Sequence, residues 1–143
     1  MNIRNQFSRV TGFTLIELLV VLVILGMLAG LVGPRVMKYA GSSRTEVARV
    51  QLEDLAAGLD LFKLDVGRYP NSNEGLQVLI ESSGTIPGWN GPYLRKNKLP
   101  KDPWGRDYIY SIPGQKNEYD LHTLGQDGKP GGDKENSDLS IWG

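Results

Sequence analysis

The sequence contains no cysteine and a single histidine, His122, among its 143 residues. Without cysteine the chain has no disulfide framework, no thiol nucleophile and no zinc site built on thiolates. One histidine leaves little for a histidine-built metal site or for a Ser-His-Asp triad. Because no acid, base and nucleophile cluster along the chain either, we expect a protein that is not an enzyme.

An excess of charge of either sign is also lacking. The chain has 16 lysine and arginine residues against 16 aspartate and glutamate residues, and no basic block follows residue 33. Proteins that bind nucleic acid usually carry a clustered basic surface. The composition therefore favours partners other than nucleic acid.

One long apolar run lies near the N-terminus. Residues 13–33 contain a single charged side chain, that of Glu17. At about 1.5 Å of rise per residue, a helix of this length crosses the roughly 30 Å hydrocarbon core of a bilayer. Arg4 and Arg9 precede the run without any acid, which favours a cytoplasmic N-terminus and a C-terminal domain on the other side.

The run does not look like an ordinary cleaved secretory signal. It is longer than the apolar core of such a signal and leads into GPRVMKYAGSS, which has no clear small-residue cleavage site. A plain N-terminal anchor is the simple interpretation. About 110 residues then remain, enough for one modest hydrophobic core.

Glu17 is the unexpected residue of the run. A carboxylate in lipid costs a few kcal/mol, so such a residue is a functional hypothesis by default. One interpretation places Glu17 near the helix end, where its side chain reaches the membrane interface. The other gives it a cationic partner, because an unpaired buried carboxylate is penalised far more than a paired one.

Two further features of the run concern helix geometry. Gly26 and Gly30 have the GxxxG spacing that lets membrane helices approach closely, although glycine is also common in membrane helices. Pro34 follows the run, and proline removes a backbone donor and kinks or breaks a helix. We therefore expect a helix break near Pro34.

Helical periodicity continues over residues 35–66. Apolar residues recur there at spacings of three to five, with charged residues largely between them. The predicted apolar stripe consists of Val47, Val50, Leu55, Leu59, Phe62 and Val66, with Leu52 beside it. The rest of the chain must cover this stripe.

Short elements are predicted after the helix. Residues 67–75, GRYPNSNEG, have turn chemistry, and residues 75–84 predict a short second helix. Residues 84–105 are rich in glycine and proline and are mostly loop. Residues 108–125 predict a hairpin around PGQKN, and residues 137–142 predict another short strand. The predicted fold class is α+β, with a long N-terminal helix packed against a small antiparallel sheet.

Several aromatic and turn residues of this part have a structural interpretation. We expect aromatic side chains to cover the helix stripe, namely those of Tyr69, Trp104, Tyr108 and Tyr110. Asp102 and Gly105 are ordinary turn formers. No catalytic role is assigned to Asp102.

The N-terminal residues resemble the signal of type IV pilins and pseudopilins. RVTGFTLIELLVVLVILGMLAG combines glycine, phenylalanine, Thr-Leu and a glutamate at the fifth position after the glycine, followed by an apolar run. The resemblance implies that a prepilin peptidase removes residues 1–12, cutting after Gly12, and that Phe13 is then N-methylated. It also implies that Glu17 pairs with the Phe13 amine of a neighbouring subunit when subunits leave the membrane. Local unwinding near Pro34 is expected in the filament.

The downstream motifs are similar to those of the major pseudopilins of type II secretion, the general secretion pathway protein G family. They are LDVGRYP at residues 64–70, EGLQVL at 74–79, DPWGRDYIY at 102–110 and LGQDGKPGG at 124–132. The resemblance covers almost the whole chain. It implies a type IV pilin-like fold, with an inner-membrane helix at residues 13–34 and a periplasmic domain at residues 35–143.

This resemblance also implies a function and a set of partners. The chain would polymerise into a helical periplasmic pseudopilus that helps export folded proteins across the outer membrane. The implied partners are further copies of the chain, minor pseudopilins, the prepilin peptidase, the inner-membrane assembly platform and membrane lipid. A cytoplasmic ATPase would supply the energy, because the chain has no phosphate-binding loop of its own.

The C-terminal loop, residues 124–140, is a candidate calcium site. Its acids are Asp127, Asp133, Glu135 and Asp138. Calcium takes about six to eight oxygen ligands, but the spacing does not match an EF-hand, so spacing alone favours a solvated acidic loop. The resemblance instead implies calcium bound by the side chains of Asp127 and Asp138 and the carbonyl of Leu124. Further carbonyls are expected from residues 132–137.

Two other functions fit part of the sequence. A type IV or competence pilin would share the N-terminal signal, but not the downstream motifs, and would form filaments outside the cell. A membrane-tethered calcium-binding module would recruit a partner without polymerising. Assembly that depends on Glu17 distinguishes the polymer from the tethered module.

Overall fold

The computed structural model describes residues 12–143. Its elements in chain order are α1 (Leu15–Val66), η1 (Leu76–Leu79), β1 (Ile109–Ser111), β2 (Asp120–Thr123), η2 (Lys134–Asn136) and β3 (Leu139–Ser140). The expected leader lies outside the described residues, apart from Gly12. The chain divides into two compact units, Met1–Tyr39 and Ala40–Gly143.

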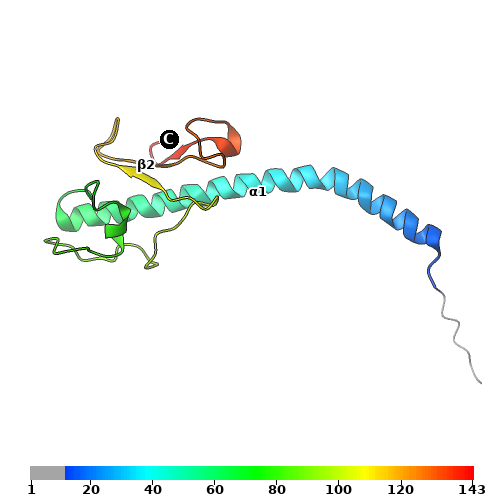
Figure 1. Ribbon diagram of the computed structural model, residues 1–143, viewed down its shortest axis with the longest axis horizontal. Helices are drawn as coiled ribbons and strands as arrows, with labels where there is room; N and C mark the ends of the chain where they lie inside the picture. The colour runs from blue at the N-terminus through cyan, green and yellow to red at the C-terminus, as the bar shows by residue number, and fades with distance from the viewer. Residues whose placement is uncertain (1–11) are drawn as a thin grey trace, which may run out of the picture. The chain divides into compact units, whose positions relative to one another are not determined.

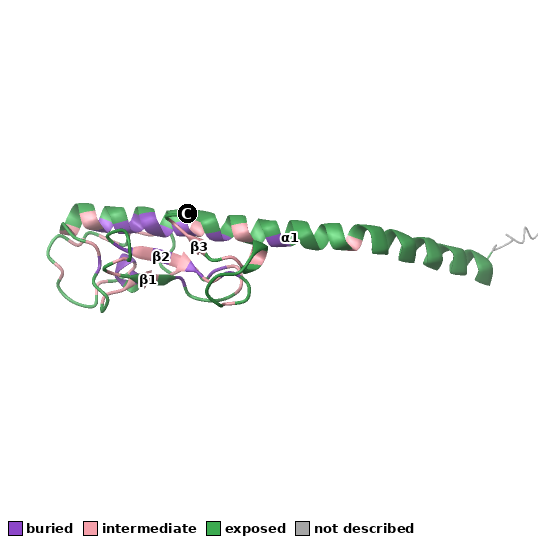
Figure 2. Cartoon of the chain, turned by 90° about the horizontal axis from the view of Figure 1, so that it is seen from above, coloured by how far each residue is buried: buried purple, intermediate pink, exposed green. Residues whose placement is uncertain are grey.

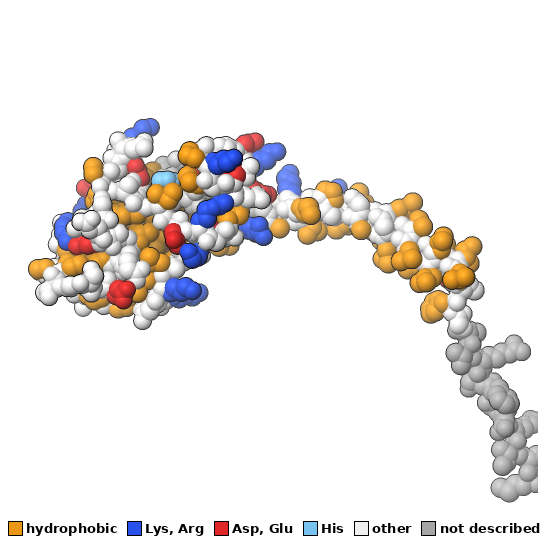
Figure 3. Space-filling view, viewed as in Figure 1, with side chains coloured by type: hydrophobic (Ala, Val, Ile, Leu, Met, Phe, Trp, Pro, Cys, Tyr) orange, Lys and Arg blue, Asp and Glu red, His pale blue; other side chains and the backbone are white. Residues whose placement is uncertain are grey.

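The first unit contributes the N-terminal part of α1, and that part is bare. Every described residue of the unit is exposed except Gly33, which is intermediate. Apolar side chains line this stretch of the helix on the face seen in Figure 3. By length and composition α1 is able to cross a membrane, and its most apolar window is 0% buried. A helix that is apolar all round and that no other described part of its chain covers suits lipid or other subunits.

The predicted helix break at Pro34 is wrong for this structure. The helix α1 runs for 52 residues with Pro34 inside it. A proline within a helix removes one hydrogen bond to the carbonyl four residues earlier, and it costs about 3 kcal/mol. The remaining bonds of a helix this long carry it past the proline. Unwinding near Pro34 upon assembly stays a prediction.

The second unit begins with an amphipathic stretch of α1. Its buried residues are Gly41, Ala48, Leu52, Leu55, Ala56, Gly58, Leu59 and Phe62. Their spacing of three and four residues keeps most of them on one face of the helix. Figure 2 shows this buried face turned toward the strands.

The predicted stripe is correct from Leu55 onward and wrong at its beginning. Val47 and Val50 are each 50% exposed, whereas the neighbouring Ala48 is 0% and Leu52 is 2% exposed. Two adjacent rows of apolar residues run along this part of the helix. Periodicity alone does not show which row meets the core, and the sheet packs on the second one.

The three strands form one antiparallel sheet in the order β1-β2-β3. Tyr110 of β1 pairs with Leu121 of β2, and Thr123 of β2 pairs with Leu139 of β3. Leu121 is fully buried in the core shared with α1, and Figure 1 shows β2 alongside this half of the helix. The structure confirms both the hairpin and the third strand predicted from turn chemistry and alternation.

The predicted second helix is a single 3-10 turn, η1. Leu76, Val78 and Leu79 are buried in the core, so the turn faces the core with residues that are nearly consecutive.

Tyrosines close the core over α1. Tyr108 is 6% exposed, and its hydroxyl donates to Gln51 Oε1 at 2.6 Å. The hydroxyl of Tyr69 donates to Asp60 Oδ1 at 2.9 Å. The packing role predicted for these two residues is confirmed. Burial raises the pKa of Tyr69 to about 12, and the bond to Asp60 adds to the shift.

The turn at residues 67–75 is organised by one carboxylate. The Arg68 guanidinium donates to both oxygens of Glu74, at 2.7 and 2.8 Å. Asn71 N–H donates to the same carboxylate at 2.8 Å, and Asn71 Oδ1 accepts from the Glu74 N–H at 2.9 Å. The motif RYPNSNEG therefore encodes a closed polar turn that leads from α1 to η1.

Candidate functional sites: the N-terminal segment and the C-terminal loop

The predicted cleavage and methylation residues precede α1. Gly12 and Phe13 lie outside regular structure and are both exposed, Phe13 at 93%. No heavy atom lies within 4 Å of the position that a Cβ would take at Gly12. Both residues that flank the predicted cut are therefore exposed, and the cut itself stays a prediction.

Thr14 and Glu17 form a reciprocal cap at the start of α1. The N–H and the hydroxyl of Thr14 donate to Glu17 Oε2, at 2.7 and 2.9 Å. In return the Glu17 N–H donates to Thr14 Oγ1 at 3.3 Å. This is a capping box, in which a threonine and the glutamate three residues later satisfy each other's backbone donors. Glu17 thus has a partner within its own chain.

The capping box is visible in the sequence as a local motif, although it is not among the features predicted above. The letters TLIE carry the threonine-to-glutamate spacing of the motif. The interface position and the cationic partner predicted for Glu17 both concern its surroundings, whereas the cap concerns the backbone of α1. Its pairing with a neighbouring Phe13 amine stays a prediction.

The C-terminal loop between β2 and β3 closes on itself. Gln126 N–H donates to the Glu135 carbonyl at 2.8 Å, and a Cβ at Gly125 would lie 2.6 Å from the Ser137 carbonyl oxygen. Gly125 has φ +64, a conformation that suits glycine, and the close approach likewise leaves no room for a side chain. The two limbs of the loop therefore lie against each other. These contacts place residues 125–126 beside residues 135–137, so the predicted ligand positions 124 and 138 flank the paired limbs.

Each predicted carboxylate ligand also bonds to backbone. Asp127 Oδ1 accepts from Lys129 N–H at 3.0 Å, and Asp138 Oδ2 accepts from Gly131 N–H at 2.9 Å. Within residues 12–143, no group of three or more acidic, histidine or cysteine side chains is placed to hold a metal ion. A metal in this loop would need main-chain carbonyls beside the two carboxylates, a mixture that calcium accepts.

A guanidinium that the sequence does not predict lies at this loop. Arg106 Nη1 donates to the Gly125 carbonyl at 2.7 Å, and Nη2 donates to the Gln126 carbonyl at 3.0 Å. A Cβ at Gly128 would lie 2.7 Å from Arg106 Cζ, so the guanidinium packs closely on the turn. Nothing in the spacing of these residues along the chain signals the contact.

Asp102 anchors the turn that carries Arg106. It is 3% exposed, and its Oδ1 accepts from Trp104 N–H at 3.1 Å and from Arg106 N–H at 2.8 Å. Its Oδ2 accepts from the Thr123 hydroxyl at 2.5 Å. Both oxygens serve the turn and the end of β2, in agreement with the structural role expected for Asp102.

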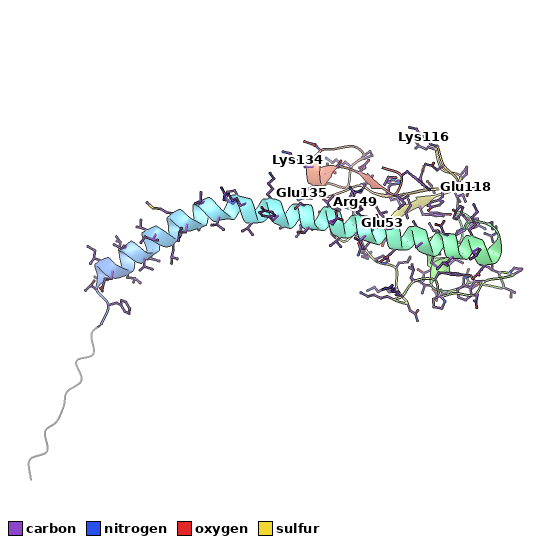
Figure 4. The ribbon with its side chains drawn as sticks, turned by 180° about the vertical axis from the view of Figure 1, so that it is seen from behind. Arg49, Glu53, Lys116, Glu118, Lys134 and Glu135 are labelled. Carbon is purple, nitrogen blue, oxygen red and sulfur yellow. The ribbon has the colours of Figure 1, made fainter. Side chains whose placement is uncertain are left out.

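Glu135 connects the loop to α1. Its carboxylate lies against Gly41, where it takes the space that a Cβ would need. Figure 4 shows Glu135 beside the helix. This loop acid therefore faces the helix.

Comparisons with known proteins agree with this geometry. The family model described as Type II secretion system (T2SS), protein G matches residues 35–142, and the Prokaryotic N-terminal methylation motif matches residues 7–33. Type II secretion system core protein G of Pseudomonas aeruginosa is 45% identical over 141 residues, covering 96% of this chain and 98% of that protein. Its counterpart in Vibrio cholerae is 40% identical and covers 96% and 95%.

A solved structure shares the fold. The crystal structure of the major pseudopilin from the type 2 secretion system of enterohaemorrhagic Escherichia coli matches with a TM-score of 0.59 and 30% identity. The match covers 74% of this chain and 92% of that one.

A small α+β domain on a long apolar helix defines the class of pilin-like, membrane-anchored subunits. Within that class, the chain belongs to the type II secretion system protein G family, the major pseudopilins. The family consists of structural subunits and is not a known enzyme family.

Proposed function

We propose that this chain is cut after Gly12, methylated on Phe13 and polymerised from the inner membrane into a periplasmic pseudopilus. The N-terminus would be cytoplasmic and residues 35–143 periplasmic, as the basic residues before the apolar run favour. The filament would drive export of folded proteins across the outer membrane. Catalysis has no part in this proposal.

The bare N-terminal part of α1 carries the proposal. Leu15, Ile16 and Leu18 are exposed at 89%, 70% and 56%, as are the apolar residues that follow them. Lipid would cover these side chains while the subunit is in the membrane. In a filament, the helices of other copies would cover them. Polymerisation therefore gives the helix an apolar environment outside the bilayer.

Glu17 would set the register of this packing. A carboxylate among apolar helices needs a cationic partner, and the Phe13 amine of a neighbouring copy has the charge and the location for it. Both Thr14 donors bond to Glu17 Oε2, so Glu17 Oε1 is the oxygen that the intersubunit pair would use. The cap and the intersubunit pair are therefore compatible.

The further partners follow from the same route of assembly. A prepilin peptidase would process the precursor, and the inner-membrane assembly platform would receive the mature subunit. Minor pseudopilins would join copies of this chain in the filament. Family membership supports these partners as a class.

Calcium is the proposed ligand of the C-terminal loop. Asp127 and Asp138 would contribute carboxylate oxygens and Leu124 its carbonyl. Among residues 132–137, the carbonyls of Asp133, Lys134 and Glu135 already accept backbone hydrogen bonds. The carbonyls of Gly132, Asn136 and Ser137 are therefore the better candidates for the remaining ligands. Binding there would join the two limbs of the loop and stabilise the folded domain by mass action.

Substitutions at Glu17 and Thr14 test the polymer mechanism. Glu17→Val removes the carboxylate, whereas Thr14→Val removes the capping hydroxyl and keeps the carboxylate. Thr14→Ser is the matched control, because serine also caps a helix. The readouts are sheared filaments and secretion by intact cells that carry the remaining secretion components.

We expect Glu17→Val to abolish filaments and secretion, while Thr14→Ser keeps both. If Thr14→Val fails as completely as Glu17→Val, capping alone explains the glutamate and the intersubunit pair is wrong. Normal filaments from Glu17→Val would remove the proposed assembly mechanism. Filaments displayed on the cell surface at native expression would favour the type IV pilin function.

A further inference from the structure

Arg106 lies far from the C-terminal loop in sequence but contacts it directly in the structure. Its two terminal nitrogens donate to the carbonyls of Gly125 and Gln126, which are the residues between the predicted ligands at 124 and 127. Hydrogen bonds from an ionised donor are roughly twice as strong as neutral ones. The fork geometry of the guanidinium fixes the two peptide groups relative to each other.

The guanidinium is itself held in place. The Arg106 backbone bonds to Asp102 in both directions, since its N–H donates to Asp102 Oδ1 at 2.8 Å and its carbonyl accepts from Asp102 N–H at 2.8 Å. The same buried carboxylate accepts the Thr123 hydroxyl at 2.5 Å. Thr123 is the last residue of β2, directly before the loop. One buried acid thus ties down the start of the loop and the turn that carries Arg106.

The other side of the turn closes on the guanidinium. Gly128 has φ +66, and a Cβ there would lie 2.7 Å from Arg106 Cζ. Asp127 lies between the bonded residues and this glycine. Its carboxylate accepts from Lys129 N–H, and the ion pairs formed in residues 12–143 do not include Arg106. The guanidinium therefore holds the backbone around Asp127 without neutralising the carboxylate.

We propose that Arg106 is the positioning residue of the calcium loop. This inference rests on the proposed calcium site. The guanidinium keeps the Gly125 and Gln126 carbonyls turned toward itself and fixes the backbone on both sides of Asp127. The first limb of the loop is then ordered before calcium binds. The metal meets a preformed limb, and less ordering opposes its binding.

The test uses the full chain in detergent, titrated calorimetrically with calcium chloride after removal of metal by a chelator. Arg106→Gln removes the positive charge and the pair of guanidinium nitrogens that donate to the two carbonyls. Arg106→Lys keeps the charge but presents a point charge that cannot reproduce the two fixed bonds. Arg95→Gln is the control, because Arg95 is an exposed arginine in another loop. Hydrogen exchange of the metal-free chains at residues 124–128 is a second readout, with residues 76–79 as the internal reference.

We expect Arg106→Gln to weaken calcium binding at least about tenfold, as loss of a supporting partner does at other metal sites. Arg106→Lys should lie between it and the wild type, and Arg95→Gln should bind as the wild type does. Exchange should quicken at residues 124–128 and not at 76–79. A purely structural role would leave the dissociation constant of the folded protein unchanged.

A dissociation constant for Arg106→Gln within about twofold of the wild type would overturn the inference while leaving the calcium site intact. If Arg106→Gln does not fold, Arg106→Lys carries the test, because it keeps the charge without the two fixed bonds. Calcium binding by Arg106→Lys within about twofold of the wild type would then overturn the inference. A wild-type chain that binds no calcium would overturn both this inference and the proposed metal site.

Discussion

The carboxylate of Glu135 packs on the backbone of Gly41, so that a residue of the C-terminal loop rests on α1 where the second unit begins. Gly41 is buried although it lies on a helix surface, because the glutamate covers it. Glycine destabilises a helix by about 1 kcal/mol relative to alanine. The contact with the loop therefore explains why a glycine suits this position.

Gly41→Ala tests this contact through a double-mutant cycle. In the wild-type background the new methyl group must displace Glu135, which offsets the gain in helix propensity, so we expect no net stabilisation. In the Glu135→Ala background the space is free, and the same change should stabilise the chain by about 1 kcal/mol. Urea unfolding of the four chains in detergent provides the measurement. Equal effects of Gly41→Ala in both backgrounds would contradict the contact.

The turn at residues 67–75 predicts a specific pH dependence. The hydrogen bonds from the Arg68 guanidinium lower the pKa of Glu74 below its usual value of 4.5. A carboxylate with a lowered pKa in the folded state adds stability above its unfolded pKa and loses it as the pH falls through the folded value. The Arg68 side chain is 46% exposed, so solvent screening limits the contribution to about 1 kcal/mol or less.

Glu74→Gln should therefore lower the free energy of unfolding at pH 7, with a difference from the wild type that shrinks below about pH 4.5. Unfolding in urea between pH 3 and pH 7 checks this expectation. Glu53→Gln is the control, because Glu53 is exposed on α1 and takes no part in the ion pairs of the described residues. A Glu74→Gln difference that does not vary with pH would contradict the role of the ion pair.

Lys134 is the one residue other than glycine with a positive φ in the described chain, at 56°. Such a conformation costs an ordinary side chain roughly 1–2 kcal/mol relative to glycine. Lys134→Gly should therefore stabilise the second unit by about 1 kcal/mol, less the extra freedom of glycine in the unfolded chain. Lys129→Gly, in the same loop but without a positive φ, should be neutral or destabilising. Thermal unfolding of the two variants distinguishes them, and equal effects would contradict strain at residue 134.

Calcium should raise the unfolding temperature of the full chain in detergent. A ligand at about 100 times its dissociation constant contributes roughly 2.7 kcal/mol, which shifts a domain of this size by several degrees. Asp127→Asn and Asp138→Asn should each abolish the shift. Asp133→Asn should keep it, because Asp133 caps η2 and asparagine caps equally well. An unchanged midpoint upon chelation of calcium would remove the metal from the proposal.

The predictable features of this fold have local causes. Each of three signals depends only on residues that are close together in the sequence: the apolar run, the amphipathic residues around Leu59 and the turn residues between β1 and β2. The structure contains the elements that these signals predict. The error at Val47 and Val50 has a different origin. Which of two apolar rows meets the core depends on where the sheet packs, and the sheet is built from residues far along the chain.

The sites divide in the same way. Thr14 and Glu17 could have been assigned from their spacing, because a capping box is a local motif. The contacts of Arg106 with the loop and of Glu135 with Gly41 join segments that are distant in the sequence. Sequence periodicity does not predict such contacts. Pro34 shows the limit of a propensity rule, since one lost hydrogen bond does not end a helix of this length.

The bare helix of the first unit makes this chain a surfactant. The N-terminal part of α1 is solvated favourably by hydrocarbon, and the second unit of the chain is solvated favourably by water. A single copy is therefore stable only where hydrocarbon and water meet. A pool of subunits is therefore a two-dimensional population of molecules in the plane of the membrane. The concentration that governs polymer growth is then a number of copies per area of membrane. Growth would respond to crowding and thickness of the bilayer as directly as to the amount of protein synthesised.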